Sequence, residues 1–262
     1  MKIQDICRFM ESFAPTALSE SWDNVGLLCG DRSAPCSRVM TCLTVTPESA
    51  NEAVERGAQL IVSHHPIPFR PMKSLTEDET VGHLLRTLIR ADVAIYSPHT
   101  SFDSATRGIN QQIAEALGLS SILPFVPHPE ADGGTGRFGE FPQPIDLGTF
   151  LSRVKTLFRL PYVQYVGAPS ASVRRVGIGC GAAGDFFKHA LRTKCDVFLT
   201  GEANFHTCLE SKARSLPLVL MTHFAGERFA CENLAQILKE ELPDLESVWA
   251  CESEVEPIAT FF

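Results

Sequence analysis

Histidines and acids stand together at four places in this 262-residue chain, each after a segment that predicts a β-strand. The groups are Ser63-His64-His65-Pro66, His99 to Asp103, Glu202 to His206, and His223 to Glu227. In α/β folds, ligand sites are usually built where strands end. Neutral imidazole is a common ligand for zinc, iron and nickel, and carboxylates suit harder cations. Together the four groups therefore predict a metal centre.

Each of the first two groups has a second interpretation. A turn at Pro66 would bring the imidazoles of His64 and His65 to one cleft, but such a pair can also consist of capping or surface histidines. Asp103 is a candidate hard ligand, with His99 as a ligand or as the partner that orients one. Alternatively, Asp103 only caps the helix that follows it.

The other two groups pair an acid and a histidine four residues apart. Glu202 and His206 would share one face of a helix, or else Glu202 complements the dipole at a helix start. His223 and Glu227 offer one nitrogen and two oxygens to one volume, and a carboxylate can bridge two metal ions. Of the remaining histidines, His83 falls on a predicted helix, and we assign His128 and His189 to a loop and the surface.

Helices and strands that could position these groups alternate along the chain. Apolar spacing predicts helices over 2–13, 47–56, 80–91, 107–117, 147–158, 186–193 and 227–238. Short apolar runs predict strands over 39–45, 60–63, 93–96, 173–179, 197–200 and 216–221. This alternation indicates an α/β fold with helices packed on sheets, whose strand order stays open.

Three further segments have no such periodicity. Residues 124–148 are rich in Pro and Gly and predict a crossing between domains that holds at most a short strand. Residues 179–184 resemble a dinucleotide-binding loop, but the following segment lacks the expected acid other than Glu202, so we favour a tight packing turn. Residues 22–26, which include Trp22, line a cleft or brace a loop. The tail, 248–262, has strand character.

The composition excludes several classes of protein. A net charge of -8 argues against nonspecific nucleic-acid binding, which needs clustered cations. The nine cysteines form no C-x-x-C pair, so we expect reduced, buried thiols. The N-terminus does not resemble a signal peptide, and the apolar runs are shorter than the roughly 20 residues of a membrane helix. We therefore expect a cytoplasmic protein without membrane contact.

Five motifs resemble those of one known family, in order along nearly the whole chain. They are residues 22–27, 63–66 with 71–75, 99–103, 200–202 and 223–227, with Gly134 to Glu140 between them. The chain is similar to the Nif-three-like family, whose bacterial members are labelled GTP cyclohydrolase I type 2 homologues. Two positions depart from the family pattern: Gly226 replaces a small hydroxyl residue, and Thr44 replaces an acid.

The resemblance implies two α/β domains with mixed sheets flanked by helices. The first would comprise residues 1–125 and about 222–262 and carry most metal ligands, and the second about 126–221. The resemblance also implies a toroidal homohexamer with two divalent metal ions per subunit, for which zinc, iron, manganese and nickel are all suitable. The ligands carried over from the motifs are His64, His65, Asp103, His223 and Glu227, with Glu227 bridging.

The implied activity is that of a metal-dependent hydrolase acting on a nucleotide or a related small molecule. With GTP, the reaction would open the purine five-membered ring and release formate, and His99 or Glu202 would carry the proton. Hydrolysis of phosphoesters at the same centre is a second expectation. The alternative from another class is a metal-binding scaffold or metallochaperone without turnover of its own.

Overall fold

The computed structural model describes residues 1–261 and divides into two compact units. Unit 1 consists of residues 1–102 and 230–261, and unit 2 of residues 103–229. Each unit is built on its own mixed sheet flanked by helices, which confirms the predicted α/β class. The chain changes unit within two helices, α4 (His99–Ser104) and α9 (His223–Glu241). Residues 103–125 and 222–229, assigned from the sequence to the first domain, therefore pack with the second unit.

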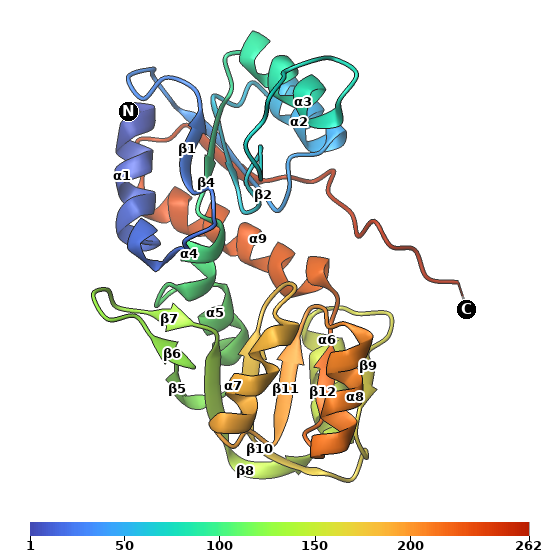
Figure 1. Cartoon of the computed structure of the whole chain (residues 1–262). Coiled ribbons are helices and arrows are strands. Elements are labelled where there is room, and N and C mark those ends of the chain that lie inside the picture. The colour runs from blue at the N-terminus through green and yellow to red at the C-terminus, as the bar shows by residue number, and fades with distance from the viewer. Residues whose placement is uncertain (262) are drawn as a thin grey trace. The chain divides into compact units, whose positions relative to one another are not determined.

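The sheet of unit 1 has the strand order β1-β4-β3-β2-β13. These strands are β1 (Gly26–Cys29), β4 (Ala94–Ser97), β3 (Leu60–Ser63), β2 (Arg38–Cys42) and β13 (Ser247–Ala250). Four of them run parallel, and β1 is added antiparallel at the edge. Because β2, β3 and β4 are parallel neighbours, the residues that follow them emerge at the same end of the sheet (Figure 1).

Alternating side chains of this sheet pack on opposite faces, since successive residues of a strand point apart. Met40, Ile61 and Ile95 lie in one cluster with residues of α2 (Pro47–Glu55) and α3 (Thr80–Arg90). On the other face, the Thr41 hydroxyl donates to the carbonyl of Cys231 in α9 at 2.7 Å. The helix α1 (Ile3–Phe13) lies on that second face as well, in contrast to α2 and α3 (Figure 1). Each fully buried aliphatic side chain stabilises such a core by about 1.5–3 kcal/mol.

Unit 2 contains a six-stranded sheet in the order β5-β8-β10-β11-β12-β9. The strands are β5 (Ser120–Leu123), β8 (Arg137–Asp146), β10 (Ser172–Gly179), β11 (Val197–Thr200), β12 (Leu218–Leu220) and β9 (Gln164–Val166). The central three, β10, β11 and β12, are parallel, and the outer strands are antiparallel. The remaining elements are α5 (Ile109–Ala116), α6 (Leu147–Leu157), α7 (Phe187–Arg192), α8 (Phe205–Arg214) and the small pair β6 (Val126–Pro127) and β7 (Gly134–Thr135).

The Pro- and Gly-rich stretch is the main difference from the sequence prediction. Instead of a crossing with at most a short strand, it contains β8, whose 10 residues pair with both β5 and β10. Pro142 and Pro144 fall between the pairs Glu140↔Arg175 and Ile145↔Val173, where the register shifts. Proline cannot donate to a ladder, and a bulge is one of the places in a sheet that accepts it.

Several predicted segments differ from the structure at their bounds, and the strand predicted over 39–45, for example, is observed at Arg38–Cys42. The helix expected over 227–238 begins earlier, at His223, and extends to Glu241. The strand-like tail forms a strand only at Ser247–Ala250, and Phe262 lies outside the described residues. Across residues 1–261, the helices are too short or too polar to cross a bilayer.

Candidate metal centre

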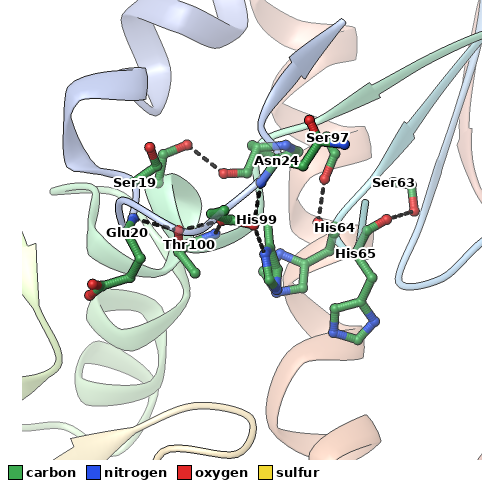
Figure 2. Close-up of polar contacts among 12 residues, drawn as sticks. Ser19, Glu20, Asn24, Ser63, His64, His65, Ser97, His99 and Thr100 are labelled. Atoms are coloured by element: carbon green, nitrogen blue, oxygen red, sulfur yellow. Dashed lines mark hydrogen bonds and ion pairs between the residues drawn. The ribbon is translucent and has the colours of Figure 1, made fainter. Parts of the chain in front are cut away.

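His64 and His65 follow β3 directly, as the sequence predicts. Their backbone N–H groups continue the parallel pairing beyond the strand, donating to the carbonyls of Cys42 at 2.9 Å and Leu43 at 2.8 Å. Their carbonyls accept from the hydroxyls of Ser97 at 2.7 Å and Ser63 at 2.8 Å, contacts that Figure 2 shows. These hydrogen bonds fix the backbone of His64 and His65, and so the positions from which the two imidazoles extend.

His99 completes a group of three imidazoles in unit 1, called the histidine set from here on: His64, His65 and His99. Each of them offers one ring nitrogen, and these atoms lie within 4.8 Å of one another. The centroids of the His64 and His65 rings are 5.0 Å apart, and His99 lies 5.3 Å from His64 and 5.6 Å from His65. His64 is only 2% exposed. His65 and His99 are half-buried. A cluster of imidazole nitrogens of this kind suits zinc, iron or nickel.

Asp23 orients His99. The carboxylate of Asp23 accepts from Nδ1–H of His99 at 2.7 Å and from the backbone N–H groups of Thr100 at 3.1 Å and Asn24 at 2.8 Å. Burial of the Asp23 carboxylate opposes its ionisation, but the hydrogen bonds from His99 and Thr100 outweigh it and lower its pKa to about 2. Because Asp23 is ionised and only accepts, Nδ1 of His99 carries a proton and Nε2 is the nitrogen left for chemistry.

Thr44 has a comparable relation to His65. Its hydroxyl hydrogen-bonds with Nδ1 of His65 at 2.7 Å. When the hydroxyl accepts from Nδ1–H, Nε2 is the nitrogen of that ring that can bind a metal. Thr44 is one of the two positions that depart from the family pattern. The hydroxyl supplies a polar partner to the ring without adding negative charge.

Unit 2 contains a second group of donors, called the acid set: Asp103, Glu202, His223 and Glu227. His223 and Glu227 occupy the first turns of α9, and His223 Nε2 lies 3.0 Å from Glu227 Oε2. The other ring nitrogen, Nδ1, lies 3.3 Å from Glu202 Oε1. The hydrogen bond to Glu227 raises the pKa of His223 to about 9 against the effect of burial, with the charges of Glu202 and Asp103 adding to the rise. The acid set therefore favours a cation at this place.

The glycine-rich turn after β10 leaves room for the acid set. A Cβ atom on Gly181 would lie 2.2 Å from Glu227 Oε1 and 3.3 Å from His223 Nε2. The φ of Gly181 is +58°, a conformation that also favours glycine. This supports the interpretation of residues 179–184 as a packing turn. A side chain at Gly181 would displace Glu227, the candidate bridging ligand.

Asp103 is held by a small network within unit 2. The Cys180 thiol donates to Asp103 Oδ1 at 3.1 Å, and the Asn110 amide donates to the carbonyl of Asp103 at 3.1 Å. The Asn110 side-chain oxygen accepts from the backbone N–H of Cys180 at 2.8 Å, which closes the network. Burial, followed by the charges of Asp103 and Glu227, raises the pKa of the Cys180 thiol well above its usual value, so it stays a donor. Gly108, not Asp103, is the N-cap of α5.

The remaining sequence candidates lie elsewhere or have other partners. Glu202 and His206 do not share a helix face, because α8 begins at Phe205 and is capped by the Asn204 side chain. Glu202 joins His223 instead, and His206 is exposed beside Phe205. His83 pairs with Glu77 on the surface, at 2.7 Å.

Sequence reasoning missed Asp23, Thr44 and Cys180 as partners of the donors. Asp23 lies in the polar motif 22–26, which signalled only a cleft or a loop. The structure thus describes a group of imidazoles within unit 1 that could hold a metal ion, and a group of carboxylates around His223 within unit 2.

Comparisons with known proteins agree on one family. The model of the family Duf34/NIF3 (NGG1p interacting factor 3) matches residues 1–257. A GTP cyclohydrolase 1 type 2 homolog of Clostridium acetobutylicum is 32% identical over 229 residues, covering 87% of this chain and 85% of that protein. Another from Nostoc sp. is 34% identical, covering 91% and 92%. Among solved structures, Staphylococcus aureus protein SA1388 is 26% identical with a TM-score of 0.90, covering 100% of this chain and 99% of the other.

Proposed function

This chain belongs to the Duf34/NIF3 family, and from that premise we propose that it is a dinuclear metal-dependent hydrolase of a nucleotide or related small molecule. The observation that carries the proposal is the histidine set, in which three ring nitrogens lie within 4.8 Å of one another. The substrate we place first is GTP, with opening of the purine five-membered ring and release of formate. It is supported by the name of the relatives, GTP cyclohydrolase 1 type 2 homolog.

The proposed ligands are the five residues carried over from the motifs: His64, His65, Asp103, His223 and Glu227. These residues would hold divalent ions when bound, and Glu227 would be the ligand shared between them. Mixed nitrogen and oxygen donors suit zinc, iron, manganese or nickel. When bound, such ions supply a water of lowered pKa and stabilise developing negative charge.

His99 and Glu202 are the proposed proton carriers. Asp23 holds the proton of His99 on Nδ1, so Nε2 can accept a proton from a reacting group and later return it. Glu202 lies beside His223 and its side chain is 54% exposed, so it can exchange protons with solvent. In this proposal, His99 transfers a proton to and from the substrate, and Glu202 exchanges protons with solvent.

We further propose a cytoplasmic homohexamer. The prediction is a toroidal assembly whose mass in solution is six times the 28.7 kDa of one chain, measured by light scattering after gel filtration. A monomer or dimer would contradict it without affecting the metal assignment.

The test of function loads the purified protein separately with zinc, iron(II), manganese or nickel and supplies GTP. We expect release of formate, in amounts matching the loss of GTP, with at least one metal. Glu227→Ala protein treated in the same way is the control for contaminating activity. Metal binding without turnover of GTP would remove this substrate. A parallel panel of phosphoesters would then separate phosphoester hydrolysis from a scaffold that has no turnover.

A further inference from the structure

Two exposed aromatic rings lie at the edge of the histidine set. Trp22 is 60% exposed and Phe69 is 46% exposed, whereas the other tryptophan of the chain, Trp249, is only 9% exposed. The Trp22 and Phe69 rings meet edge to face, with centroids 5.9 Å apart. Large aromatic side chains are usually mostly buried, and an exposed group of them often marks a site where a ligand or a partner binds.

Both rings are turned toward His99. The centroid of Trp22 lies 6.1 Å from that of His99, and the centroid of Phe69 lies 5.9 Å from it. The pair therefore belongs to the surroundings of a polar site rather than to a flat apolar surface. A molecule packed against these rings would place its polar atoms beside the histidine set.

The two segments that carry the rings are held in place. The Asn24 side-chain amide donates to the carbonyl of Pro68 at 2.8 Å, which ties residues 22–24 to the segment before Phe69. The neighbouring carboxylate of Asp23 is fully buried and bonded to α4. The aromatic pair is thus positioned before any ligand arrives, which lowers the entropy lost on binding.

Cations follow Phe69 in the same exposed segment. Arg70 and Lys73 lie within residues 69–75, which are exposed throughout and contain no acid. They bring two positive charges next to Phe69 along the chain, and the exposed acids Glu77, Asp78 and Glu79 follow only after residue 76. Guanidinium and ammonium groups are the usual partners of phosphate.

We propose that Trp22 and Phe69 bind the planar ring of a nucleotide, with Arg70 and Lys73 attracting its phosphate. This assignment rests on the proposed function and names the residues that select its substrate class. Any nucleic-acid base can stack on an aromatic side chain, because every base has a π-face. A second copy of this chain is the other possible occupant, but it would not explain cations next to rings that face His99.

The experiment measures binding rather than turnover. Guanosine 5′-monophosphate and ribose 5-phosphate are titrated by calorimetry into the metal-loaded, full-length protein. We expect the nucleotide to bind at least about 10-fold more tightly than the sugar phosphate, which lacks the ring. In a Trp249→Phe variant, Trp22 is the remaining tryptophan, and its fluorescence should be quenched by the nucleotide only.

Variants separate ring recognition from charge. Trp22→Ala and Phe69→Leu should each weaken nucleotide binding about 10-fold and leave sugar phosphate binding unchanged. Arg70→Gln with Lys73→Gln should weaken both ligands. The matched control is Phe205→Leu, at a phenylalanine of unit 2 that is 72% exposed, and it should change neither affinity.

Unchanged nucleotide affinity in both Trp22→Ala and Phe69→Leu would overturn the proposal. If the native mass of these variants by light scattering also falls, the pair is a contact between copies of the chain. Nucleotide binding without any formate from GTP would remove ring opening of GTP as the reaction and leave the aromatic binding site supported.

Discussion

The histidine set of unit 1 and the acid set of unit 2 differ in how their charge is balanced. The histidine set contains no acid, and the buried acid next to it, Asp23, already accepts hydrogen bonds from His99, Thr100 and Asn24. In the acid set, Asp103, Glu202 and Glu227 surround one imidazole, and they raise the pKa of His223 to about 9. The histidine set therefore gathers no negative charge of its own, whereas the acid set gathers negative charge that a bound cation would offset.

The largest expected effect is the loss of metal when either set is broken. His64→Ala removes a donor of the histidine set, and Glu227→Ala removes the proposed bridging donor of the acid set. Each should weaken metal binding at least about 100-fold, because losing a residue that only hydrogen-bonds to a metal ligand already costs up to about 100-fold. Elemental analysis after gel filtration measures the metal content. His83→Ala and His206→Ala, at exposed histidines, should keep full metal, and full retention in the two ligand variants would refute the assignment.

The second effect separates proton transfer from metal binding in the histidine set. Asp23→Asn should leave the metal content unchanged but lower turnover about 100-fold, because His99 loses the partner that fixes its tautomer. Nitrogen NMR of the His99 ring should show Nδ1 protonated in the parent and a mixture of tautomers in the variant. An unchanged tautomer would refute the orienting role of Asp23.

A smaller effect should appear in the acid set. Cys180→Ala removes the thiol that donates to Asp103, and we expect metal affinity to fall about 10-fold. Cys180→Ser retains a donor and should restore most of the affinity, measured by competition with a metal chelator. If serine does no better than alanine, the thiol acts by packing rather than by orienting Asp103.

The smallest effect concerns an acid that needs no metal. Glu52 in α2 accepts from the backbone N–H groups of Glu252 at 2.9 Å and Ser253 at 2.8 Å. Burial opposes the ionisation of Glu52, but these hydrogen bonds lower its pKa to about 2. Its stabilising contribution is therefore complete above the unfolded-state pKa, about 4.3, and is lost as the pH falls toward 2.

Replacing this acid tests that contribution. Glu52→Gln should lower the free energy of unfolding by about 1 kcal/mol at pH 7 and much less at pH 2.5, in metal-free protein. Urea unfolding at both pH values gives the difference. Glu55→Gln, at an exposed residue of the same helix, is the control. An equal loss at both pH values would show that the charge of Glu52 is not involved.

The sequence predicted those parts of the fold and the site that depend on local order. Leu60–Ser63 was predicted with its observed bounds because a short apolar run before two histidines and a proline has few other interpretations. The α/β class followed in the same way from alternating periodicities. The prediction from the four-residue spacing of Glu202 and His206 failed, because that spacing places two residues on one helix face only if both lie in the helix, and α8 begins at Phe205.

Contacts between distant residues were beyond the sequence. Asp23 and His99 are 76 positions apart, and Asp103 and Cys180 are 77 positions apart. No periodicity links such residues, since they meet only when separate loops or strands pack together. β8 was missed for a related reason: its prolines argue against a strand, and only the register shift against β10 accommodates them.

The order of the strands in unit 1 has a consequence for protein synthesis. β13 pairs with β2 at the edge of the sheet, yet it follows the whole of unit 2 along the chain. At usual rates of translation, β13 leaves the ribosome on the order of ten seconds or more after β2. Throughout that interval the edge of β2 is unpaired, and we expect nascent chains to need a chaperone that covers it. Rare codons placed within unit 2 would lengthen this exposure and lower the yield of folded protein.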